Sequence, residues 1–395
     1  MPPLFDYWLA RTAGFLRPRR PARAESPARP VEPGISVVIP SRNGRELLAA
    51  QLPGIVGDLE GSPAEVIVID NGSDDGTAGW LRAEWGGVQV DISTAPLSFA
   101  RAVNRGIARA RFSHVCLLNN DMLIGPGFFR ALRRAFDDVG DLFCSTAQIR
   151  FPEGVRREET GKAVMAQEGL ADFPLRCDEP LPGEDGTPVL YGSGGCSLYD
   201  AGKLRALGGL DEAYEPAYVE DLDLGYRAWQ RSWPSVYAAG AVVEHRHRAT
   251  TRRYYSEEQL EVVLEVNYLK FLARAVADRA VFARLWKQAL DRLLLLGGRP
   301  SAREALRQAA ELARSGGPRL APKFPEEMFL ALTNGCAAVF PGTGAGPAIR
   351  SVERLEPPSP DLLRSHGEVL LVAAAESSDV FRAALRFTSQ SRPTK

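Results

Sequence analysis

Short apolar runs alternate along the chain with segments in which apolar residues recur every three or four positions. The apolar runs are rich in β-branched residues and predict strands at 35–40, 65–70, 88–93, 114–118 and 236–245. The periodic segments between the first four runs predict helices at 45–59, 77–85 and 102–110. Because the strands are mostly continuous in apolar residues, they are typical of a parallel sheet covered on both faces. The pattern therefore predicts an α/β doubly wound domain.

The pattern changes after residue 141. The following stretch is less regular and rich in turns, whereas helical periodicity returns at 256–296 and 301–316. A last strand at 368–375 is followed by a helical pattern at 377–387. We therefore expect four parts: a flexible amphipathic leader at 1–34, the α/β domain at 35–250, a helical C-terminal extension at 251–340, and a linker with a small α/β appendage at 341–395.

The leader combines a short amphipathic stretch with a linker rich in Pro and Arg. One interpretation is a disordered segment with an incidental helical turn. The alternative is a peripheral membrane contact, in which apolar side chains lie in the lipid interface while arginines meet anionic head groups. The apolar set is Leu4, Phe5, Trp8, Leu9, Phe15 and Leu16, and the basic set is Arg17, Arg19, Arg20 and Arg23.

Composition narrows the class of protein. The 395 residues carry a net charge of −1, which excludes a strong basic field of the kind that binds nucleic acid. The longest apolar stretches are far shorter than the ~18 residues that span a bilayer. Five cysteines without paired spacing favour buried thiols in a reducing compartment over a structural zinc site. We expect a cytoplasmic protein.

Polar residues with ligand-binding chemistry follow the first two strands. Pro40, Arg42 and Asn43 come after the first strand, and Asp70 ends the second. Side chains at the carboxyl ends of such strands face the crevice in which ligands bind. The Asp70 carboxylate can accept the imide hydrogen of a pyrimidine base. The alternative for the segment DNGSDDGT at 70–77 is a capped turn, because Asx and Gly residues favour turns without any ligand.

The strand predicted at 114–118 leads into Asn119, Asn120 and Asp121. One carboxylate flanked by two amides suits a single divalent cation that also carries a diphosphate and water. His245, at the end of the last strand before the helical extension, can complete such a site beside Asp121. Simpler alternatives are a strand-end turn for NND and a structural role for the histidine.

Three acids, Glu220, Asp221 and Asp223, open a predicted helix. A helix dipole stabilises carboxylates in the first turn, so these acids can serve only as caps. The alternative is catalytic, with Asp221 removing the proton of an attacking hydroxyl. The glycine-rich segment 192–195 permits either close approach of the backbone to a ligand or a plain tight turn.

Over about residues 35–250 the chain resembles family 2 glycosyltransferases of the GT-A fold. The motifs that carry the resemblance are SVVIPSRNG (36–44), VIVIDNGSDDGT (66–77), the NxG sequence at 104–106, LLNND (117–121), GSGGCSLY (192–199), LGGLDEAYEPAYVEDLDLGYRA (207–228) and VVEHRH (242–247). The resemblance implies a mixed sheet with a Rossmann-like nucleotide-binding half and an acceptor half.

The resemblance also implies a role for each matched position. The donor, a UDP-, dTDP- or GDP-sugar, would be bound by Pro40, Arg42, Asn43, Asp70, Asn104, Asn119 and Asn120. Asp121 and His245 would hold Mn²⁺ or Mg²⁺, although the DXD motif here has an amide in place of its first acid, as in rhamnosyl and galactofuranosyl transferases. Asp221 would be the general base, and Glu220 would help to hold the acceptor. His247 has no role in this scheme.

These roles amount to an inverting transfer of a sugar from a nucleotide-diphosphate donor to a hydroxyl of a glycan or lipid-linked acceptor, as in cell-envelope polysaccharide synthesis. A single displacement needs no nucleophilic carboxylate, unlike a retaining glycosidase. One alternative is a nucleotidyltransferase, but PSRNGREL lacks the Gly- and Lys-rich loop that holds a triphosphate. The other is an inactive scaffold that binds a nucleotide sugar, which the missing first acid of NND favours.

Overall fold

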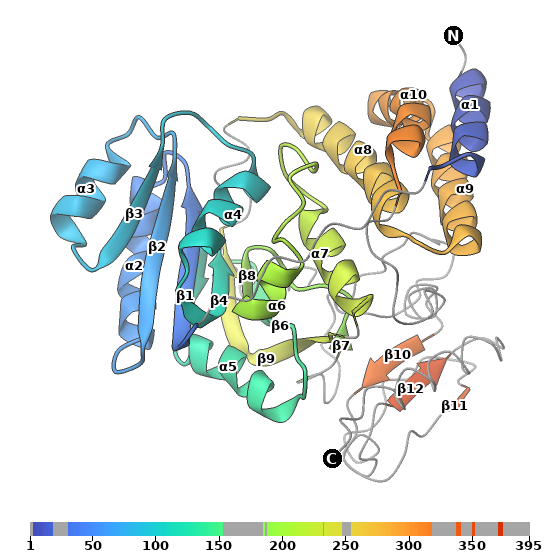
Figure 1. Cartoon of the computed structure of the whole chain (residues 1–395). Helices are drawn as coiled ribbons and strands as arrows, with labels where there is room; N and C mark the ends of the chain where they lie inside the picture. Colours follow the sequence, from blue (N-terminus) through green and yellow to red (C-terminus); the bar gives the residue numbers. More distant parts are fainter. Residues whose placement is uncertain are drawn as a thin grey trace.

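The computed structural model describes residues 3–18, 31–152, 185, 188–231, 233–246 and 254–317, and the backbone of three short strands nearer the C-terminus. Within these residues, nine strands form one mixed sheet in the order β3-β2-β1-β4-β8-β6-β9-β5, with β7 paired to β9 (Figure 1). The strands are β1 (Glu32–Ser41), β2 (Ala64–Asn71), β3 (Val88–Ser93), β4 (Phe112–Leu118), β5 (Met122–Ile124), β6 (Cys144–Arg150), β7 (Pro188–Val189), β8 (Cys196–Asp200) and β9 (Ser235–His245).

The half of the sheet formed by β3, β2, β1 and β4 is parallel. Its connecting helices are α2 (Arg45–Asp58), α3 (Thr77–Glu84) and α4 (Phe99–Arg109). Apolar residues of α2 and α3 pack on one face of the sheet, and those of α4 pack on the other. Burial on both faces explains why these strands are continuously apolar. The predicted α/β doubly wound class is confirmed.

The other half of the sheet is mixed. β4 pairs antiparallel with β8, β8 pairs antiparallel with β6, and β6 runs parallel to β9. Helices α5 (Phe128–Asp138) and α6 (Ala201–Ala206) pack on opposite faces. β5 pairs antiparallel with β9, which sets Met122 opposite His245. This pairing brings the NND sequence to the end of β9, more than one hundred positions later in the chain.

A helical layer stands beside the sheet (Figure 1). It consists of α1 (Pro3–Phe15), α8 (Glu257–Ala275), α9 (Arg279–Leu295) and α10 (Pro300–Ser315), whose buried residues share one apolar core. α7 (Glu220–Trp229) joins the two parts of the molecule. Its Leu222 and Tyr226 belong to the helical core, whereas Leu224 and Ala228 pack with α4 and the sheet. The helix that begins with the ED pair is therefore held from both sides.

The single helical pattern predicted at 256–296 is divided in the structure. Asp278 accepts hydrogen bonds from the backbone N–H groups of Ala280 and Val281, at 2.8 and 2.9 Å, and so begins α9. Residues 276–278, which end with this N-cap, separate the two helices.

The N-terminal helix α1 packs against α9 and α10. The Tyr7 hydroxyl donates to the Asp291 carboxylate at 2.6 Å, and the Trp286 indole N–H donates to the Ala10 carbonyl at 3.1 Å. This packing differs from the flexible leader expected for 1–34, because the amphipathic stretch is an ordered part of the helical layer. Most of the Arg- and Pro-rich linker lies outside the described residues.

Near the C-terminus, β10 (Ala337–Phe340), β12 (Leu370–Ala373) and β11 (Arg350–Ser351) form a small sheet in that order. β12 falls within the strand predicted at 368–375, whereas the predicted helix at 377–387 lies outside the described residues. Among the described helices, none combines the length and the hydropathy needed to cross a bilayer.

Candidate active site

The carboxyl ends of β1, β2 and β4 open into a cleft with a volume of about 400 Å³. Four predicted donor-binding residues line it, together with a predicted metal ligand: Pro40, Arg42, Asn119, Asn120 and Asp121. Its other walls include Asn71, Pro96, Phe99, Pro216, Tyr254 and Tyr255. The cleft is thus bounded by the first two strand-end loops, the N-terminus of α4, the loop before α7 and the start of the helical extension.

Arg42 spans the cleft from the loop after β1 to the segment before α8. Its guanidinium carbon lies 3.9 Å from the centroid of the Tyr254 ring, which is a cation–π contact. The Arg42 Nε atom is buried and has no hydrogen-bond partner among the described residues. A guanidinium with an unused donor in such a cleft suits a phosphate or diphosphate.

Asp70 and Asn43 are not among the residues that line the cleft. Asp70 is buried at the end of β2 and accepts a hydrogen bond from the backbone N–H of Ser73 at 3.2 Å. The Asn43 side-chain oxygen accepts one from the N–H of Asp74 at 2.9 Å. The first bond caps the DNGSDDGT turn from within, and the second braces that turn against the first loop, so the capped turn is present. Their predicted contact with the nucleotide base stays a prediction.

The NND sequence forms one corner of the cleft. The backbone N–H of Asn119 donates to the Gly195 carbonyl at 2.8 Å, and the Asn120 side chain donates to the Ser41 hydroxyl at 2.9 Å. A Cβ atom on Gly195 would lie 2.5 Å from the Asn119 amide nitrogen. Only glycine fits there without displacing that amide, so the glycine-rich segment is required for close approach to the protein's own side chain.

Asp121 and His245 meet beside this corner. The Asp121 Oδ1 atom lies 3.5 Å from the His245 Nε2 atom, and both side chains are buried. Asp121 Oδ1 has no hydrogen-bond partner among the described residues. An orphaned carboxylate oxygen beside an imidazole nitrogen fits a divalent cation, since two ligands each about 2.1 Å from an ion stand roughly 3 Å apart. No group of three or more His, Cys, Asp or Glu side chains gathers among the described residues. Beyond Asp121 and His245, the described part of the chain leaves the remaining ligand positions to substrate and water.

Glu220 and Asp221 occupy the first turn of α7. One Asp221 carboxylate oxygen accepts a hydrogen bond from the backbone N–H of Gly194 at 3.3 Å, and the other accepts from the N–H of Leu222 at 2.8 Å. Gly194 and Gly195 therefore link the base predicted at Asp221 to the NND corner. Glu220 is buried, and its Oε2 atom has no hydrogen-bond partner among the described residues.

Burial raises the pKa of Glu220 well above its ordinary value, and the neighbouring Asp221 carboxylate raises it further. A neutral carboxylic acid can donate a hydrogen bond, which an ionised one cannot. Burial and the neighbouring carboxylate thus favour the protonated form of Glu220, while Asp221 accepts the Gly194 N–H.

We expect the Glu220→Gln variant to become more stable relative to the unmodified protein as pH rises. Because folding raises the pKa of Glu220, the folded state keeps a proton that the unfolded state has lost, and stability falls with pH above the ordinary value of 4.5. The unmodified protein loses about 1.4 kcal/mol of its free energy of unfolding for each pH unit between the unfolded-state and folded-state pKa values of Glu220. Glutamine does not titrate, so the variant does not lose it. Urea unfolding at pH 5 and pH 8 measures it, with the exposed Glu46→Gln as control. If the free energy of unfolding changed with pH equally in both variants, folding would not raise the pKa of Glu220.

Asn104, which was predicted to bind the donor, lies outside the cleft lining. Its amide group donates to the Leu210 carbonyl at 2.9 Å and accepts from the Leu210 N–H at 3.0 Å. Gly106 packs so tightly on β1 that a Cβ atom would lie 2.2 Å from Val38. Asn104 and Gly106, the two ends of the NxG sequence, therefore both serve to pack α4 against neighbouring parts of the fold.

Comparison with known proteins fits this geometry. Residues 33–261 match the family described as Glycosyltransferase like family 2. The chain belongs to this glycosyltransferase family. The N-acetylglucosaminyl-diphospho-decaprenol L-rhamnosyltransferase of Mycobacterium tuberculosis is 30% identical over 215 residues, which are 48% of this chain and 69% of the relative. An uncharacterized protein y4gI of Sinorhizobium fredii is 25% identical over 60% of this chain and 27% of its own length.

Solved glycosyltransferase structures are similar in part to this glycosyltransferase. Residues 1–349 of S. aureus TarS, in complex with UDP-GlcNAc, give a TM-score of 0.48 at 13% identity, covering 70% of this chain and 81% of that TarS segment. The mannosyltransferase PcManGT of Pyrobaculum calidifontis, in complex with GDP-Man and Mn²⁺, gives 0.46 at 16% identity, covering 78% and 83%. The GT-A assignment rests on the family match and on the strand order.

The glycosyltransferase cleft also contains residues that sequence reasoning missed. Asn71 donates to the Leu97 carbonyl at 3.0 Å and accepts from the Leu97 N–H at 2.7 Å, which holds the loop before α4 at the edge of the cleft. Tyr254 and Tyr255 arrive from the start of the helical extension. The only signal for the tyrosines is their position as an aromatic pair just before a helix start, and that pattern is common in loops.

Proposed function

We propose that this glycosyltransferase moves a sugar, with inversion, from a nucleotide-diphosphate donor to a hydroxyl group of a glycan or lipid-linked acceptor. The observation that carries the proposal is how groups beside the cleft connect to its NND corner: the Gly194 N–H donates to Asp221, the Gly195 carbonyl accepts from the Asn119 N–H, and Asp121 lies beside His245. Asp221, Glu220 and His245 are not themselves among the residues that line the cleft. In an inverting transfer the diphosphate leaves from one side of the sugar and the hydroxyl attacks from the other. The groups that stabilise the diphosphate and the group that takes the hydroxyl proton must therefore lie on opposite sides of the sugar.

The donor side of the proposal involves the NND corner. Asn119 and Asn120 would position the donor, and Arg42 would pair with the diphosphate through its unused donor. Asp121 and His245 would hold Mn²⁺ or Mg²⁺, and such an ion, when bound, stabilises the charge of the departing nucleotide diphosphate. The protein's own contribution is to bring one carboxylate and one imidazole to the same buried point.

The acceptor side of the proposal involves α7. Asp221 would take the proton of the incoming hydroxyl as that oxygen attacks the anomeric carbon, and attack from the face opposite the leaving group inverts that carbon. Glu220, with its raised pKa, would help to hold the acceptor as a neutral acid. The rhamnosyltransferase relative acts on a decaprenol-linked diphospho-sugar, which supports a lipid-linked acceptor and a role in cell-envelope polysaccharide synthesis.

A screen of nucleotide sugars tests the function. We expect one of the UDP-, dTDP- or GDP-sugars to raise the melting temperature, because a ligand that binds only the folded state stabilises it by mass action. The same donor should then release its nucleotide in the presence of a polyprenyl-diphosphate-linked sugar and Mn²⁺ or Mg²⁺. Binding of a donor without any transfer would favour the inactive scaffold.

The proposal includes contact with the inner face of the cell membrane through α1. Tyr7, Ala10 and Ala13 face the helical core, whereas the opposite side exposes Leu4, Phe5, Trp8, Leu9, Phe15 and Leu16. Phe15 is 88% exposed and Trp8 is 61% exposed. Arg11 stacks beside Trp8, and Arg19, Arg20 and Arg23 follow in the sequence. Arg17, which was expected to meet head groups with them, instead donates to the Ala273 and Val276 carbonyls of the helical layer. Aromatic rings bordered by arginines suit an anionic lipid surface, where a lipid-linked acceptor would be found.

Flotation with phosphatidylcholine vesicles, with and without phosphatidylglycerol, tests this contact. We expect the protein to bind the anionic vesicles, and the double change Phe5→Ser and Trp8→Ser to lower binding more than tenfold, since each aromatic ring contributes about 1.5–3 kcal/mol on burial. Val56→Ser on α2, also an exposed apolar residue, is the matched control. Equal flotation of all three proteins, or a concentration-dependent dimer that the double change disrupts, would contradict the membrane surface.

A further inference from the structure

One face of α8 carries three polar side chains that reach the loop before the ED pair. Asn267, Lys270 and Arg274 are three and four residues apart, so they lie on the same side of the helix. Lys270 donates to the Ala213 carbonyl at 2.7 Å, and Arg274 pairs with the Asp211 carboxylate at 2.6 Å. The helical extension thus holds the loop 211–219 along its length.

That loop ends in a strained turn. Tyr218 and Val219 have φ angles of 73° and 76°, a region that residues other than glycine rarely adopt and that is an outlier for a β-branched side chain. Such a conformation costs about 1–3 kcal/mol at each residue and persists only where the surroundings impose it. Val219 is the N-cap of α7, and its carbonyl accepts the N–H of Asp223 at 2.9 Å. The turn therefore fixes the direction in which Glu220 and Asp221 leave it.

Asn267 is the residue that imposes this conformation from α8. Its amide nitrogen donates to the carbonyls of Ala217 and Tyr218 at 3.0 and 3.1 Å, and its oxygen accepts from Lys270 at 3.0 Å. The side chain is 1% exposed. All its hydrogen-bonding groups are used, and a buried group deprived of its partner costs about 1–3 kcal/mol. Asn267 thus holds the two peptide carbonyls on either side of Tyr218.

On its other side the loop borders the cleft. The Pro216 carbonyl accepts the N–H of Phe99 at 2.9 Å, and Pro216 and Ala217 line the cleft together with Phe99. The strained turn is therefore held between α8 and the N-terminus of α4. Without the α8 contact, Asp221 would keep its hydrogen bond to Gly194, but the turn that leads into Asp221 would no longer be held in one conformation.

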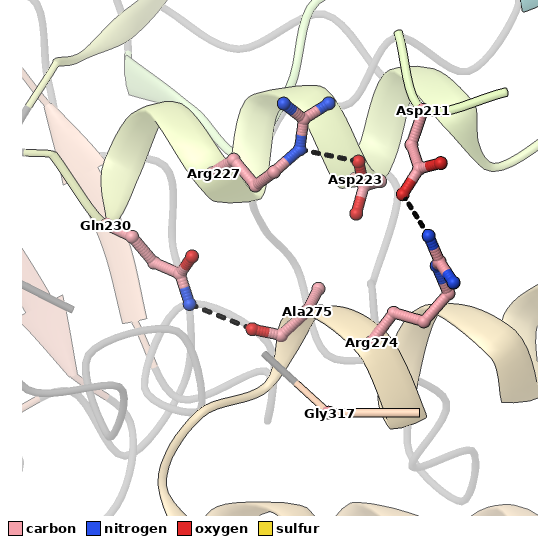
Figure 2. Close-up of a pocket in the computed structure, with 7 residues that line it drawn as sticks. All are labelled: Asp211, Asp223, Arg227, Gln230, Arg274, Ala275 and Gly317. Atoms are coloured by element: carbon pink, nitrogen blue, oxygen red, sulfur yellow. Dashed lines mark hydrogen bonds and ion pairs between the residues drawn. The ribbon is translucent and has the colours of Figure 1, made fainter. Parts of the chain in front are cut away.

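A second layer of contacts fixes the rest of α7 (Figure 2). Arg227 pairs with Asp223 of the same helix at 2.7 Å, and its guanidinium also donates to the Leu207 and Gly209 carbonyls at 2.8 and 2.9 Å. The Gln230 side chain donates to the Ala275 carbonyl at 2.9 Å. These side chains and the Asp211–Arg274 pair surround a cavity of about 20 Å³, enough for one water. Because the body of α7 is anchored independently, removal of the Asn267 contacts would change the start of the helix without detaching it.

We propose that Asn267 is a positioning residue for the transfer reaction: from the helical extension it holds the strained Ala217–Val219 turn in the conformation that aims Asp221 at the acceptor hydroxyl. The inference rests on the proposed role of Asp221 as the base. It makes the helical extension a working part of the active site.

Asn267→Asp tests the proposal, because aspartate has the same shape but cannot donate to the two carbonyls. We expect kcat to fall about 10- to 100-fold, as for a catalytic group displaced by a fraction of an ångström to one ångström, with the donor KM within twofold of the unmodified value. The pH at which kcat falls on the acidic side should also move, because the surroundings of Asp221 change. Ser301→Ala, which removes a different buried hydrogen bond of the helical extension, is the control.

A second variant approaches the same turn from the other side and does not depend on Asn267. Val219→Gly relieves the positive φ angle, so we expect a melting temperature near that of the unmodified protein together with a lower kcat. The positioning role would be overturned if both variants lost donor affinity by the same factor as kcat. It would also be overturned if kcat and its pH profile were unchanged. If Asp221→Asn itself left transfer unaffected, the base assignment would fail instead, so the two failures are distinguishable.

Discussion

Replacement of Asp221 by asparagine is expected to lower kcat for sugar transfer by about 10²- to 10⁴-fold while the donor still binds. The amide keeps the shape of the carboxylate and can still accept the N–H of Gly194, but it cannot take a proton from the acceptor hydroxyl. Because the donor contacts are proposed for other residues of the cleft, the thermal shift produced by the donor should persist. The measurement is steady-state transfer with the donor identified by the screen, beside donor-induced stabilisation of the same samples.

The matched control for this prediction is Asp137→Asn. Asp137 is an exposed residue of α5 whose side chain pairs with Arg133 on the same helix, so its charge can be removed without touching the cleft. We expect its kcat to equal that of the unmodified protein. A loss of donor binding equal to the loss of kcat in Asp221→Asn would assign Asp221 to the donor side. Unchanged turnover would remove it from the mechanism.

Changes at Asp121 and His245 are expected to weaken metal dependence rather than the fold. Asp121→Asn should raise the Mn²⁺ or Mg²⁺ concentration needed for half-maximal transfer by about 10- to 100-fold or more, because removal even of groups that support a metal ligand has effects of that size. His245→Ala should act in the same direction. The two changes combined should do little more than the larger one, since their atoms lie 3.5 Å apart and would serve one ion.

Direct binding separates this prediction from a general loss of activity. The increase in melting temperature produced by MnCl₂ alone should disappear in both variants and remain in His114→Gln, which alters a histidine that lies beside Phe136 of α5, away from the cleft. Identical metal titrations for Asp121→Asn and the unmodified protein would sink the metal site. In that case the orphaned Asp121 oxygen would require another partner.

The sequence predicts those strands whose buried positions are occupied by apolar residues. β1 and β2 are apolar at nearly every position because helices cover both faces of the parallel half. β6 was missed although it is just as buried, because the polar residues Ser145, Thr146 and Gln148 interrupt its apolar pattern. The Ser145 hydroxyl donates to the Leu132 carbonyl, and Thr146 accepts from Ser197, so these polar groups are satisfied inside the core. A hydrophobic pattern cannot reveal a strand whose polar side chains are paired within the protein.

The site was predictable where chemistry coincides with a strand end. Asp121 and His245 could be paired from sequence because each follows an apolar run, and the β5–β9 pairing brings them together. The amide of Asn104 bonds to Leu210 outside the cleft lining, so its predicted contact with the donor stays a prediction. Tyr254 and Asn267 were beyond reach for another reason: they belong to the helical extension, whose docking against the loop before α7 has no local signature in the sequence.

The packing of α1 also has a consequence for the order in which the molecule can be assembled. Tyr7 bonds to Asp291 across 284 positions, and Ala10 bonds to Trp286 across 276. At about 5–20 residues per second, α1 leaves the ribosome at least roughly ten seconds before its partners exist. During that interval the face that later meets Trp286 is uncovered along with the outer apolar face. Until Trp286 and Asp291 have been synthesised, α1 therefore exposes apolar residues on two of its sides.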